Sequence, residues 1–129
     1  MERTSVDPWE WGKAFGLSQA VELVEAQRVL VCSGQAAIGP GGDPPATDDM
    51  AGQLRTCLAN LTTVLEAAGM SLADVVKVVL YTTDMDALLE SYGMVVEAFA
   101  PNRPAVNLFE IRRFAFVEMK VEIDAVAAR

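Results

Sequence analysis

The chain has 129 residues, the length of one ordinary domain and enough to bury a substantial core. Hydrophobic residues make up 52% and charged residues 22%, a balance typical of globular proteins and not of disordered ones. Ten basic residues against 18 acidic ones give a formal net charge of −8. A surface of that sign repels the phosphates of nucleic acids, so we expect a single domain over residues 1–129 without a nucleic-acid partner.

The absence of histidine excludes several kinds of chemistry. No Ser-His-Asp or Cys-His arrangement, imidazole zinc site or histidine general base can form, and RNA cleavage would depend on carboxylates alone. Cys32 and Cys57 have a spacing that fits no metal or redox motif. We predict two buried thiols, with a disulfide as the alternative, and no metal site formed by these cysteines.

No apolar run approaches the roughly 20 residues that a membrane-spanning helix needs. The first residues, Met1–Pro8, lack the apolar core of a secretion signal. These features predict a cytoplasmic protein that does not contact a membrane.

The first third of the chain is predicted to form strands after an irregular start. Residues 1–17 are rich in aromatic and turn-forming side chains and are expected to pack onto the body of the domain as an irregular segment. Residues 18–24 and 28–33 are predicted to pair as a hairpin of two β-strands. The Gly- and Pro-rich stretch 39–45 cannot hold regular structure and is predicted to be a loop.

The middle of the chain alternates helices with a strand. Thr47-Asp48-Asp49 provides capping residues for a helix whose apolar side repeats every three or four residues and whose end is marked by Gly69. Residues 75–81 are rich in β-branched side chains and predict a central strand. A second amphipathic helix is expected to follow the caps at 83–86 and to end before Pro101.

Two more strands are predicted, at 105–111 and at 117–125, where apolar and charged residues alternate strictly. The order of elements is β-β-α-β-α-β-β, which indicates an α+β domain with two layers, in which both helices cover one face of a single sheet. The other face carries apolar side chains that nothing in the sequence covers. We therefore expect the protein to oligomerise through its sheet.

Five short segments carry a resemblance to a known family. Together, in their order and spacing, they resemble the RidA/YjgF family of reactive imine and enamine deaminases over nearly the whole chain, from Phe15 to the end. The segments are Ser18-Gln19-Ala20, Ser33-Gly34-Gln35, Asp74–Lys77 followed by Tyr81–Asp84, Arg103-Pro104-Ala105, and Val121–Ala125.

The resemblance implies a chorismate-mutase-like α+β fold with a mixed sheet, assembled as a homotrimer with three clefts between neighbouring subunits. In active family members each cleft hydrolyses 2-imino or enamine acids to 2-keto acids and ammonia without a cofactor or metal. Because an imine carbon is already electrophilic, the site needs little more than an oriented water and a substrate held in place. The implied partner is a small-molecule metabolite.

The resemblance also assigns candidate site residues. Glu122 falls where the family has the glutamate that activates water, and Ser33 and Gly34 fall on the turn that contacts the ligand. A carboxylate facing the cleft can position the water and exchange protons with the departing nitrogen. The alternating pattern alone favours a solvated carboxylate on the polar side of the strand, and it is the resemblance that favours a position in the cleft.

Four positions depart from the family pattern. Val106 stands where an arginine binds the substrate carboxylate, and losing that pair would cost a few kcal/mol, or roughly a hundred-fold in affinity. Leu108 replaces a common cysteine and Leu17 replaces a tyrosine, which makes the expected pocket more apolar. Tyr92, which the pattern also allows as a plain core residue, aligns with an asparagine. We predict weak hydrolysis of ordinary 2-imino acids.

Other residues are candidates for substrate binding. Arg112 or Arg113 could replace the missing arginine from another direction, or could form ion pairs on the surface or between subunits. Asn107 could contact the ligand or tie two strands together by hydrogen bonds. Trp9 and Trp11 could cover the mouth of the cleft, although packing against the body is the reading that we favour.

Two classes of function follow. The first is a divergent imine or enamine hydrolase with an altered substrate preference, in which Glu122 and the Ser33-Gly34 turn perform the chemistry. The second is a non-catalytic homotrimer that binds a small metabolite or regulates a partner through the same cleft. Hydrolysis of, or proton transfer on, a ring-opened or acylated amine is also compatible with these residues.

Overall fold

The computed structural model describes all 129 residues. Its strands are β1 (Glu2–Val6), β2 (Ala20–Val24), β3 (Val29–Val31), β4 (Gln35–Ala36), β5 (Val75–Thr82), β6 (Ala105–Glu110) and β7 (Val121–Ala128). Its helices are α1 (Trp11–Ala14), α2 (Met50–Ala67), α3 (Met85–Ser91) and α4 (Gly93–Phe99), with the short 3-10 helix η1 (Leu72–Asp74). None of the helices combines the length and the apolar character that crossing a membrane requires.

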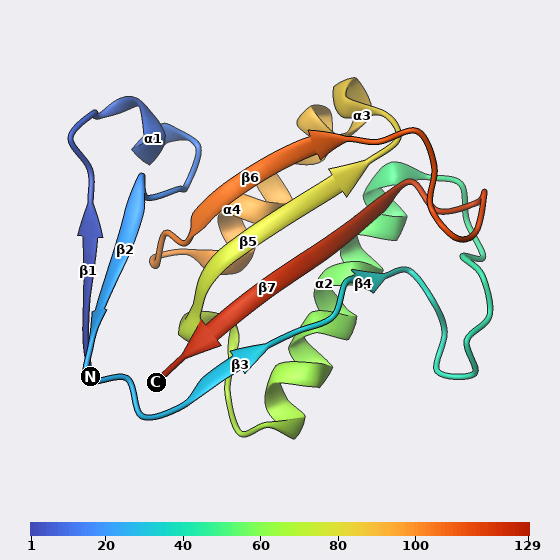
Figure 1. Cartoon of the computed structure of the whole chain (residues 1–129). Helices are drawn as coiled ribbons and strands as arrows, with labels where there is room; N and C mark the ends of the chain where they lie inside the picture. Colours follow the sequence, from blue (N-terminus) through green and yellow to red (C-terminus); the bar gives the residue numbers. More distant parts are fainter.

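The main sheet has five strands in the order β3-β7-β5-β6, with β4 pairing alongside β3 on the same edge of β7. Strands β5 and β6 run parallel, whereas β7 runs antiparallel to its neighbours, so the sheet is mixed. Helices α2, α3 and α4 lie behind this sheet in Figure 1 and leave its front face without a covering layer. The α+β architecture with helices on one face is therefore confirmed.

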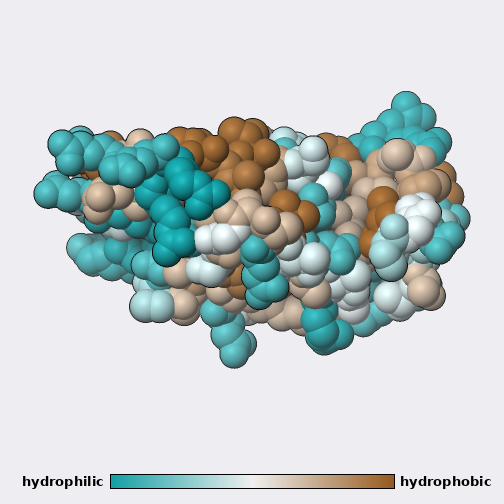
Figure 2. All heavy atoms as spheres, turned by 90° about the horizontal axis from the view of Figure 1, so that it is seen from below, coloured by the Kyte–Doolittle hydropathy of each residue, from teal (hydrophilic) through white to brown (hydrophobic).

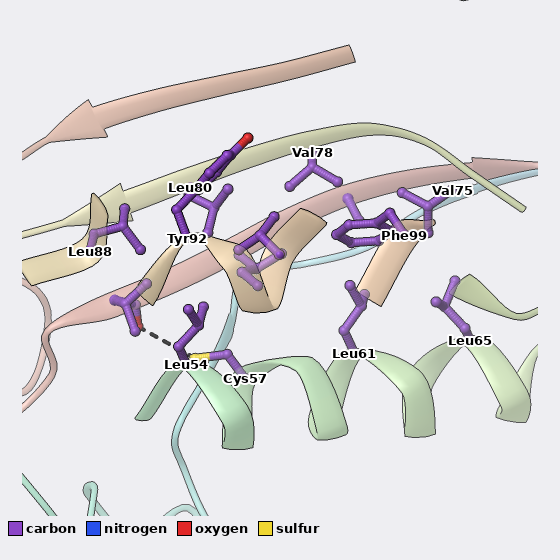
Figure 3. Packing of buried hydrophobic residues seen from close by; sticks show 14 of the residues in the cluster. Leu54, Cys57, Leu61, Leu65, Val75, Val78, Leu80, Leu88, Tyr92 and Phe99 are labelled. Carbon is purple, nitrogen blue, oxygen red and sulfur yellow. Dashed lines mark hydrogen bonds between the residues drawn. The ribbon is translucent and has the colours of Figure 1, made fainter. Parts of the chain in front are cut away.

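Helix α2 supplies most of the core from its apolar side. Leu54, Leu61 and Leu65 are fully buried against the sheet and α4, as Figure 3 shows. Burying each such side chain contributes about 1.5–3 kcal/mol to stability. Strand β7 contributes the alternate residues Val121 and Ile123 to the same core, which fixes the side of the sheet on which its other residues lie.

Both ends of α2 follow the local signals in the sequence. The Asp49 carboxylate accepts a hydrogen bond from the Gly52 amide at 2.9 Å, which caps the first turn. At the other end Gly69 has a φ of +72°, its amide donates to Glu66, and the Met70 amide donates to Leu65 at 2.8 Å. This paired arrangement satisfies the last helical carbonyls and is the common way in which glycine ends a helix.

The N-terminal part of the structure differs from the sequence prediction in two respects. Residues 2–6 form strand β1 rather than an irregular segment, and β1 pairs with β2 in a separate two-stranded sheet. The predicted hairpin between β2 and β3 is wrong, because β3 pairs with β7 instead. Glu25, with a φ of +58°, lies in the connection where the chain passes from one sheet to the other.

Two other boundaries are also corrected. The last strand begins at Val121 rather than Val117, because the Gln53 side chain forms hydrogen bonds with backbone groups of the residues that precede Val121. Its amide donates to the Glu118 carbonyl and its oxygen accepts from the Lys120 amide, both at 2.8 Å. The second predicted helix is divided at Tyr92 into α3 and α4, just before Gly93, a weak helix former.

The uncovered face of the sheet is largely apolar. It carries the residues that alternate with the core positions: Val29, Val31, Lys77, Val79, Tyr81, Asn107, Phe109, Glu122, Asp124 and Val126. Val31 is 75% exposed and Phe109 is 48% exposed. In Figure 2, seen from the end that carries both termini, apolar residues gather along one margin of the molecule, beside the more hydrophilic end where β1 and β2 lie.

Candidate functional site

Glu122 lies on the uncovered face and is packed against Gly34. A Cβ atom at Gly34 would overlap the Glu122 carboxylate, so only glycine leaves room for this side chain. The contact follows from the pairing of β4 with β7, in which Ala36 lies opposite Glu122. The structure therefore brings together two of the residues that the sequence assigned to the site, and the exposed Ser33 immediately precedes Gly34.

The segment around Gly34 is fixed to α2 by one side chain. The Asn60 amide donates hydrogen bonds to the carbonyls of Ala36 at 2.8 Å and Ile38 at 3.0 Å. These bonds satisfy backbone groups that have no strand partner on that side. Asn60 thus holds the turn in the position where Gly34 meets Glu122.

The surroundings of Glu122 favour its protonated form. Partial burial raises the pKa of this carboxyl above its ordinary value of 4.5, and the nearby Asp124 carboxylate raises it further. Tyr81 lies directly opposite Glu122 on β5, and burial and the Asp124 carboxylate raise the pKa of its phenol. The result is a half-buried carboxyl group that holds its proton more tightly than an exposed glutamate does.

A separate pocket lies at the β6 edge, on the helix side of the sheet. It has a volume of about 190 Å³ and seven lining residues, all hydrophobic: Trp11, Phe15, Leu17, Leu89, Tyr92, Val106 and Leu108. Four of these residues, Leu17, Tyr92, Val106 and Leu108, are candidates that the sequence singled out. No charged side chain lines the pocket, so nothing in it can pair with a carboxylate.

The side chains that line the pocket carry two polar atoms, the Trp11 indole nitrogen and the Tyr92 hydroxyl oxygen, and the hydroxyl is already hydrogen-bonded. The Tyr92 hydroxyl donates a hydrogen bond to the Phe15 carbonyl at 3.1 Å. Figure 3 shows the Tyr92 hydroxyl directed away from α2, while the rest of the side chain belongs to the core. Tyr92 is therefore a buried core residue and a pocket residue at the same time.

The N-terminal segment forms one wall of this pocket because Arg103 anchors it. The Arg103 guanidinium donates to the Leu17 carbonyl at 2.9 Å and to the Asp7 carboxylate at 2.8 Å. The Gln19 amide also donates to Asp7, and together these hydrogen bonds lower the pKa of the Asp7 carboxyl. The Ser18 amide adds a hydrogen bond to the Pro104 carbonyl at 3.0 Å.

Close packing holds the same segment in place. Gly16 has a φ of +65° and lies so near Val96 that a Cβ atom would approach its side chain within 2.8 Å. Trp11 and Phe15 pack edge to face with ring centroids 6.2 Å apart. Trp9 and Trp11 nevertheless remain 59% and 57% exposed, so neither packs fully onto the body.

The remaining candidates lie outside this pocket. Asn107 is exposed on the uncovered face, where its side-chain oxygen accepts a hydrogen bond from Lys77 across β5 and β6. Arg113 is exposed and donates to the Phe114 carbonyl at 3.0 Å and to the Ala115 carbonyl at 3.3 Å, within its own loop. Arg112 is exposed, and like Arg113 it does not line the apolar pocket.

Within one chain the two groups of candidate residues do not meet. Glu122 and Gly34 lie toward the β4 side on the uncovered face, whereas Val106 and Leu108 point to the helix side of β6. Strand β5 separates β7 from β6. A single copy therefore presents a carboxylate site and an apolar pocket on opposite faces of its sheet.

Cys32 and Cys57 are free thiols, so they form no disulfide. Cys57 is buried, and burial raises its pKa to about 12. Cys32 is only half-buried, and its thiol pKa is also raised by burial. These thiols are not activated nucleophiles. The structure holds no group of three histidine, cysteine, aspartate or glutamate residues placed to bind a metal.

Sequence reasoning did not identify several residues around the two groups. Asp124 could have been found, because residues two apart on a strand share a face with each other. Tyr81 could not, because its position opposite Glu122 depends on the register of β5 and β7. Phe15 was also missed, and Trp11 was considered only as a cover of the cleft mouth, because the place of both residues in the pocket depends on the distant anchor between Arg103 and Asp7.

Comparison with known proteins agrees with this architecture. The family model described as Endoribonuclease L-PSP matches residues 13–129. The chain is 33% identical over 106 residues to a RutC family protein of Pyrococcus horikoshii, covering 82% of this chain and 83% of that protein. It is 30% identical over 116 residues to the 2-iminobutanoate/2-iminopropanoate deaminase of Escherichia coli K12, covering 84% and 86%.

Solved structures show the same relationship. A protein of unknown function of the Rid family from Yersinia pestis superposes with a TM-score of 0.90 at 29% identity, over the whole of both chains. The YjgF gene product of Escherichia coli superposes with a TM-score of 0.67 at 30% identity, over 87% of each chain. The family match, the shared fold and the five sequence segments together show that the chain belongs to the RidA/YjgF family.

Proposed function

We propose that this protein is a hydrolytic deaminase of reactive imines or enamines, and that it prefers substrates without the carboxylate that 2-imino acids carry. The reaction adds water to the C=N bond and releases a carbonyl compound and ammonia. The observation that carries the proposal is the half-buried Glu122 carboxyl, packed against Gly34 and facing Tyr81 and Asp124.

The chemistry suits a single carboxyl group of this kind. In its ionised form Glu122 accepts a proton from the attacking water as oxygen bonds to the imine carbon. The same proton then passes to the nitrogen, which gives a carbinolamine. Glu122 next moves the proton of the new hydroxyl group to the nitrogen, so that the C–O bond becomes a carbonyl as the C–N bond breaks and ammonia leaves. A pKa raised by burial keeps this group closer to the working pH than an exposed glutamate would be.

We further propose that the working site lies between copies of the chain in a homotrimer. In one copy Glu122 and the apolar pocket lie on opposite faces of the sheet, so only a neighbouring copy can join them in one cleft. The uncovered apolar sheet face, with Val31 75% exposed, supports such an assembly because large apolar surfaces favour association.

Altered substrate preference is supported by the residues around Val106. Every residue that lines its pocket is hydrophobic, so a substrate carboxylate would lose its hydration without gaining a cation. Arg113 donates to carbonyls of its own loop and lies outside the pocket. Hydrolysis of 2-iminobutanoate, on which a relative's name is based, should therefore be slow.

The test is an assay of ammonia released from 2-imino acids and from neutral imines of matched size. We expect the Val106→Arg variant to gain about a hundred-fold in kcat/KM for 2-imino acids, the value of one arginine–carboxylate pair. Glu122→Gln should abolish hydrolysis of both kinds of substrate. Rates for the wild type on 2-imino acids that equal those on neutral imines would contradict the proposed preference.

A non-catalytic role is the second candidate, and one observation favours it. The apolar pocket offers no free hydroxyl, carboxylate or guanidinium, since the Tyr92 hydroxyl is bonded to the Phe15 carbonyl. Such a pocket can bind a small metabolite without transforming it, or can regulate a partner through the bound state. If neither the wild type nor Val106→Arg hydrolyses any imine, this role is favoured.

Ribonuclease chemistry is a weaker candidate despite the description of the family model. The chain carries a formal charge of −8 and no histidine. Binding of RNA depends mainly on lysine and arginine displacing counterions from phosphates. The acidic surface therefore opposes the first step of any RNA cleavage.

A further inference from the structure

The size and composition of the pocket beside Val106 limit what it can hold. Its volume is about 190 Å³, and all seven lining residues are hydrophobic. An engineered apolar protein cavity of about 150 Å³ stays dry and binds benzene. The pocket is open to solvent on one side, but it is large enough for one six-membered carbon ring or a branched alkyl group of similar size, and its walls offer water few partners.

The N-terminal segment builds one wall of the pocket. Trp11 and Phe15 supply that wall and contact each other edge to face, and the Phe15 carbonyl is held by the Tyr92 hydroxyl. Arg103 fixes the same segment through Asp7 and Leu17. These contacts form the pocket before any ligand arrives, which reduces the entropy lost on binding.

We propose that this pocket binds the hydrocarbon group of a neutral substrate, a six-membered ring or a branched alkyl group, and that Trp11 is a specificity-determining residue. This inference rests on the proposed function, which defines the imine or enamine group of the substrate. It adds the chemical class of the group that the pocket binds. The substrate is then an uncharged imine or enamine with an apolar substituent, and the product is the matching neutral ketone or aldehyde.

The geometry explains why a carboxylate is excluded rather than merely not required. Val106 and Leu108 line the position where the family pattern places charged and polar side chains. A carboxylate buried against them would meet only carbon atoms, and transfer of an unpaired ion into such a site is strongly unfavourable. The pocket therefore selects between two molecules that share a hydrocarbon group and differ in that charge.

The test is ligand binding, measured on the assembled full-length protein with Trp9→Phe as the background. That change leaves Trp11 as the only tryptophan, and Trp9 does not line the pocket. The probes are cyclohexylacetone and cyclohexylpyruvate, which share the ring and the ketone and differ in a methyl group against a carboxylate. Acetone, which has no ring, serves as the third probe.

We expect cyclohexylacetone to change the Trp11 emission with saturation, and cyclohexylpyruvate to bind at least about ten-fold more weakly. Acetone should have no effect at the same concentrations. Equal or tighter binding of cyclohexylpyruvate would overturn the inference, and so would the absence of any saturable response to cyclohexylacetone.

Two substitutions at one position show where the probe sits. Val106→Phe fills the pocket and should weaken cyclohexylacetone binding by about ten-fold or more, whereas Val106→Ala enlarges it and should admit a bulkier ring. Unchanged binding in Val106→Phe, with the same Trp11 response, would place the ligand elsewhere. If Val106→Phe does not fold, Val106→Ala still decides, because failure to admit the bulkier ring contradicts the pocket assignment.

The binding test is independent of the proposed reaction. If the neutral ketone binds with saturation but no imine is hydrolysed, the pocket assignment stands and the proposed enzymatic function is wrong. If hydrolysis depends on Glu122 but the ketone does not bind, the proposed enzymatic function stands and the pocket assignment is wrong.

Discussion

Gly34 and Glu122 form the most restrictive contact among the candidate residues. The carboxylate occupies the space that a side chain at Gly34 would fill, and burial together with Asp124 raises its pKa. A solvated carboxylate on the polar side of a strand would need neither a glycine neighbour nor a fixed turn. Here the turn is held by Asn60 through two hydrogen bonds. This arrangement supports the proposal that Glu122 is a positioned functional group.

Adding one methyl group at Gly34 tests that positioning. In Gly34→Ala the new Cβ atom overlaps the Glu122 carboxylate and must displace it, so we expect imine hydrolysis to fall by about a hundred-fold, the loss typical of a misplaced catalytic group. Gly39→Ala is the matched control, because a Cβ atom there meets nothing within 4 Å. Equal activity of the two variants would show that the contact has no catalytic role.

The raised pKa of Glu122 predicts that replacing this residue lowers activity without lowering stability. Because its folded pKa lies above the ordinary value, the native state binds this proton more tightly, and ionisation at higher pH lowers the free energy of unfolding. Glu122→Gln removes that cost, so the variant should be at least as stable as the wild type near neutral pH.

The difference in the free energy of unfolding between Glu122→Gln and the wild type should vanish once the pH falls below the ordinary glutamate value of 4.5. Urea denaturation at several pH values measures it, alongside the assay in which the same variant is expected to be inactive. A variant that is both inactive and less stable near neutral pH would indicate that Glu122 is a structural residue.

At the scale of elements, the N-terminal segment is joined to the body at the start of β6. Arg103 reaches back to Asp7 and Leu17, and Ser18 pairs with Ala105 as an isolated parallel bridge. These contacts link parts of the chain that are far apart in sequence. They place Trp11 and Phe15 at the pocket, so the N-terminal segment supplies one wall of the candidate site and also takes part in the small β1–β2 sheet.

Asp7 makes this attachment dependent on pH. Hydrogen bonds from the Gln19 amide and from Arg103 lower its pKa, so it stabilises the fold above the ordinary value of 3.8 and loses that contribution as the pH falls through the lower folded value. Asp7→Asn should therefore be less stable than the wild type near neutral pH, and the gap should close in acid. A gap of constant size across that range, in urea titrations, would contradict this role.

At the scale of the whole molecule, the sheet has helices on one face only. The other face exposes Val29, Val31 and Phe109 beside charged residues. Such a face is unusual for a monomer and typical of a surface that a second copy covers. The proposed trimer accounts for the apolar surface and for the separation of the two groups of site residues.

A charge on this face should disrupt the assembly. Val31→Asp places an unpaired carboxylate on the surface that copies are proposed to bury, so we expect it to lower the molar mass seen by light scattering toward that of one chain. Val117→Asp is the control, because Val117 is also highly exposed, at 72%, but lies outside the sheet. Val31→Asp chains that retain the wild-type molar mass would exclude this face from the interface.

The sequence predicted those features that depend on neighbours along the chain. Asp49 and Gly69 delimit α2 by local hydrogen bonds, and the alternation in β7 placed Glu122 opposite the core side. The prediction that β2 pairs with β3 was wrong, because β7, about 100 residues away, competes for β3. The apolar pocket was expected from Leu17 and Leu108, but its Trp11 wall depends on long-range contacts that no local pattern encodes.

The central claim is that one copy supplies Glu122 and a neighbouring copy supplies the apolar pocket, and mixing two variants that are each impaired in one half of the site tests it most directly. Glu122→Gln and Val106→Phe chains are each assayed alone, then unfolded together and refolded as a mixture. If the site is shared between copies, about a quarter of the sites in randomly mixed trimers combine two intact halves and activity returns to that level. If the mixture stays as inactive as its components, the two groups do not form one site between copies.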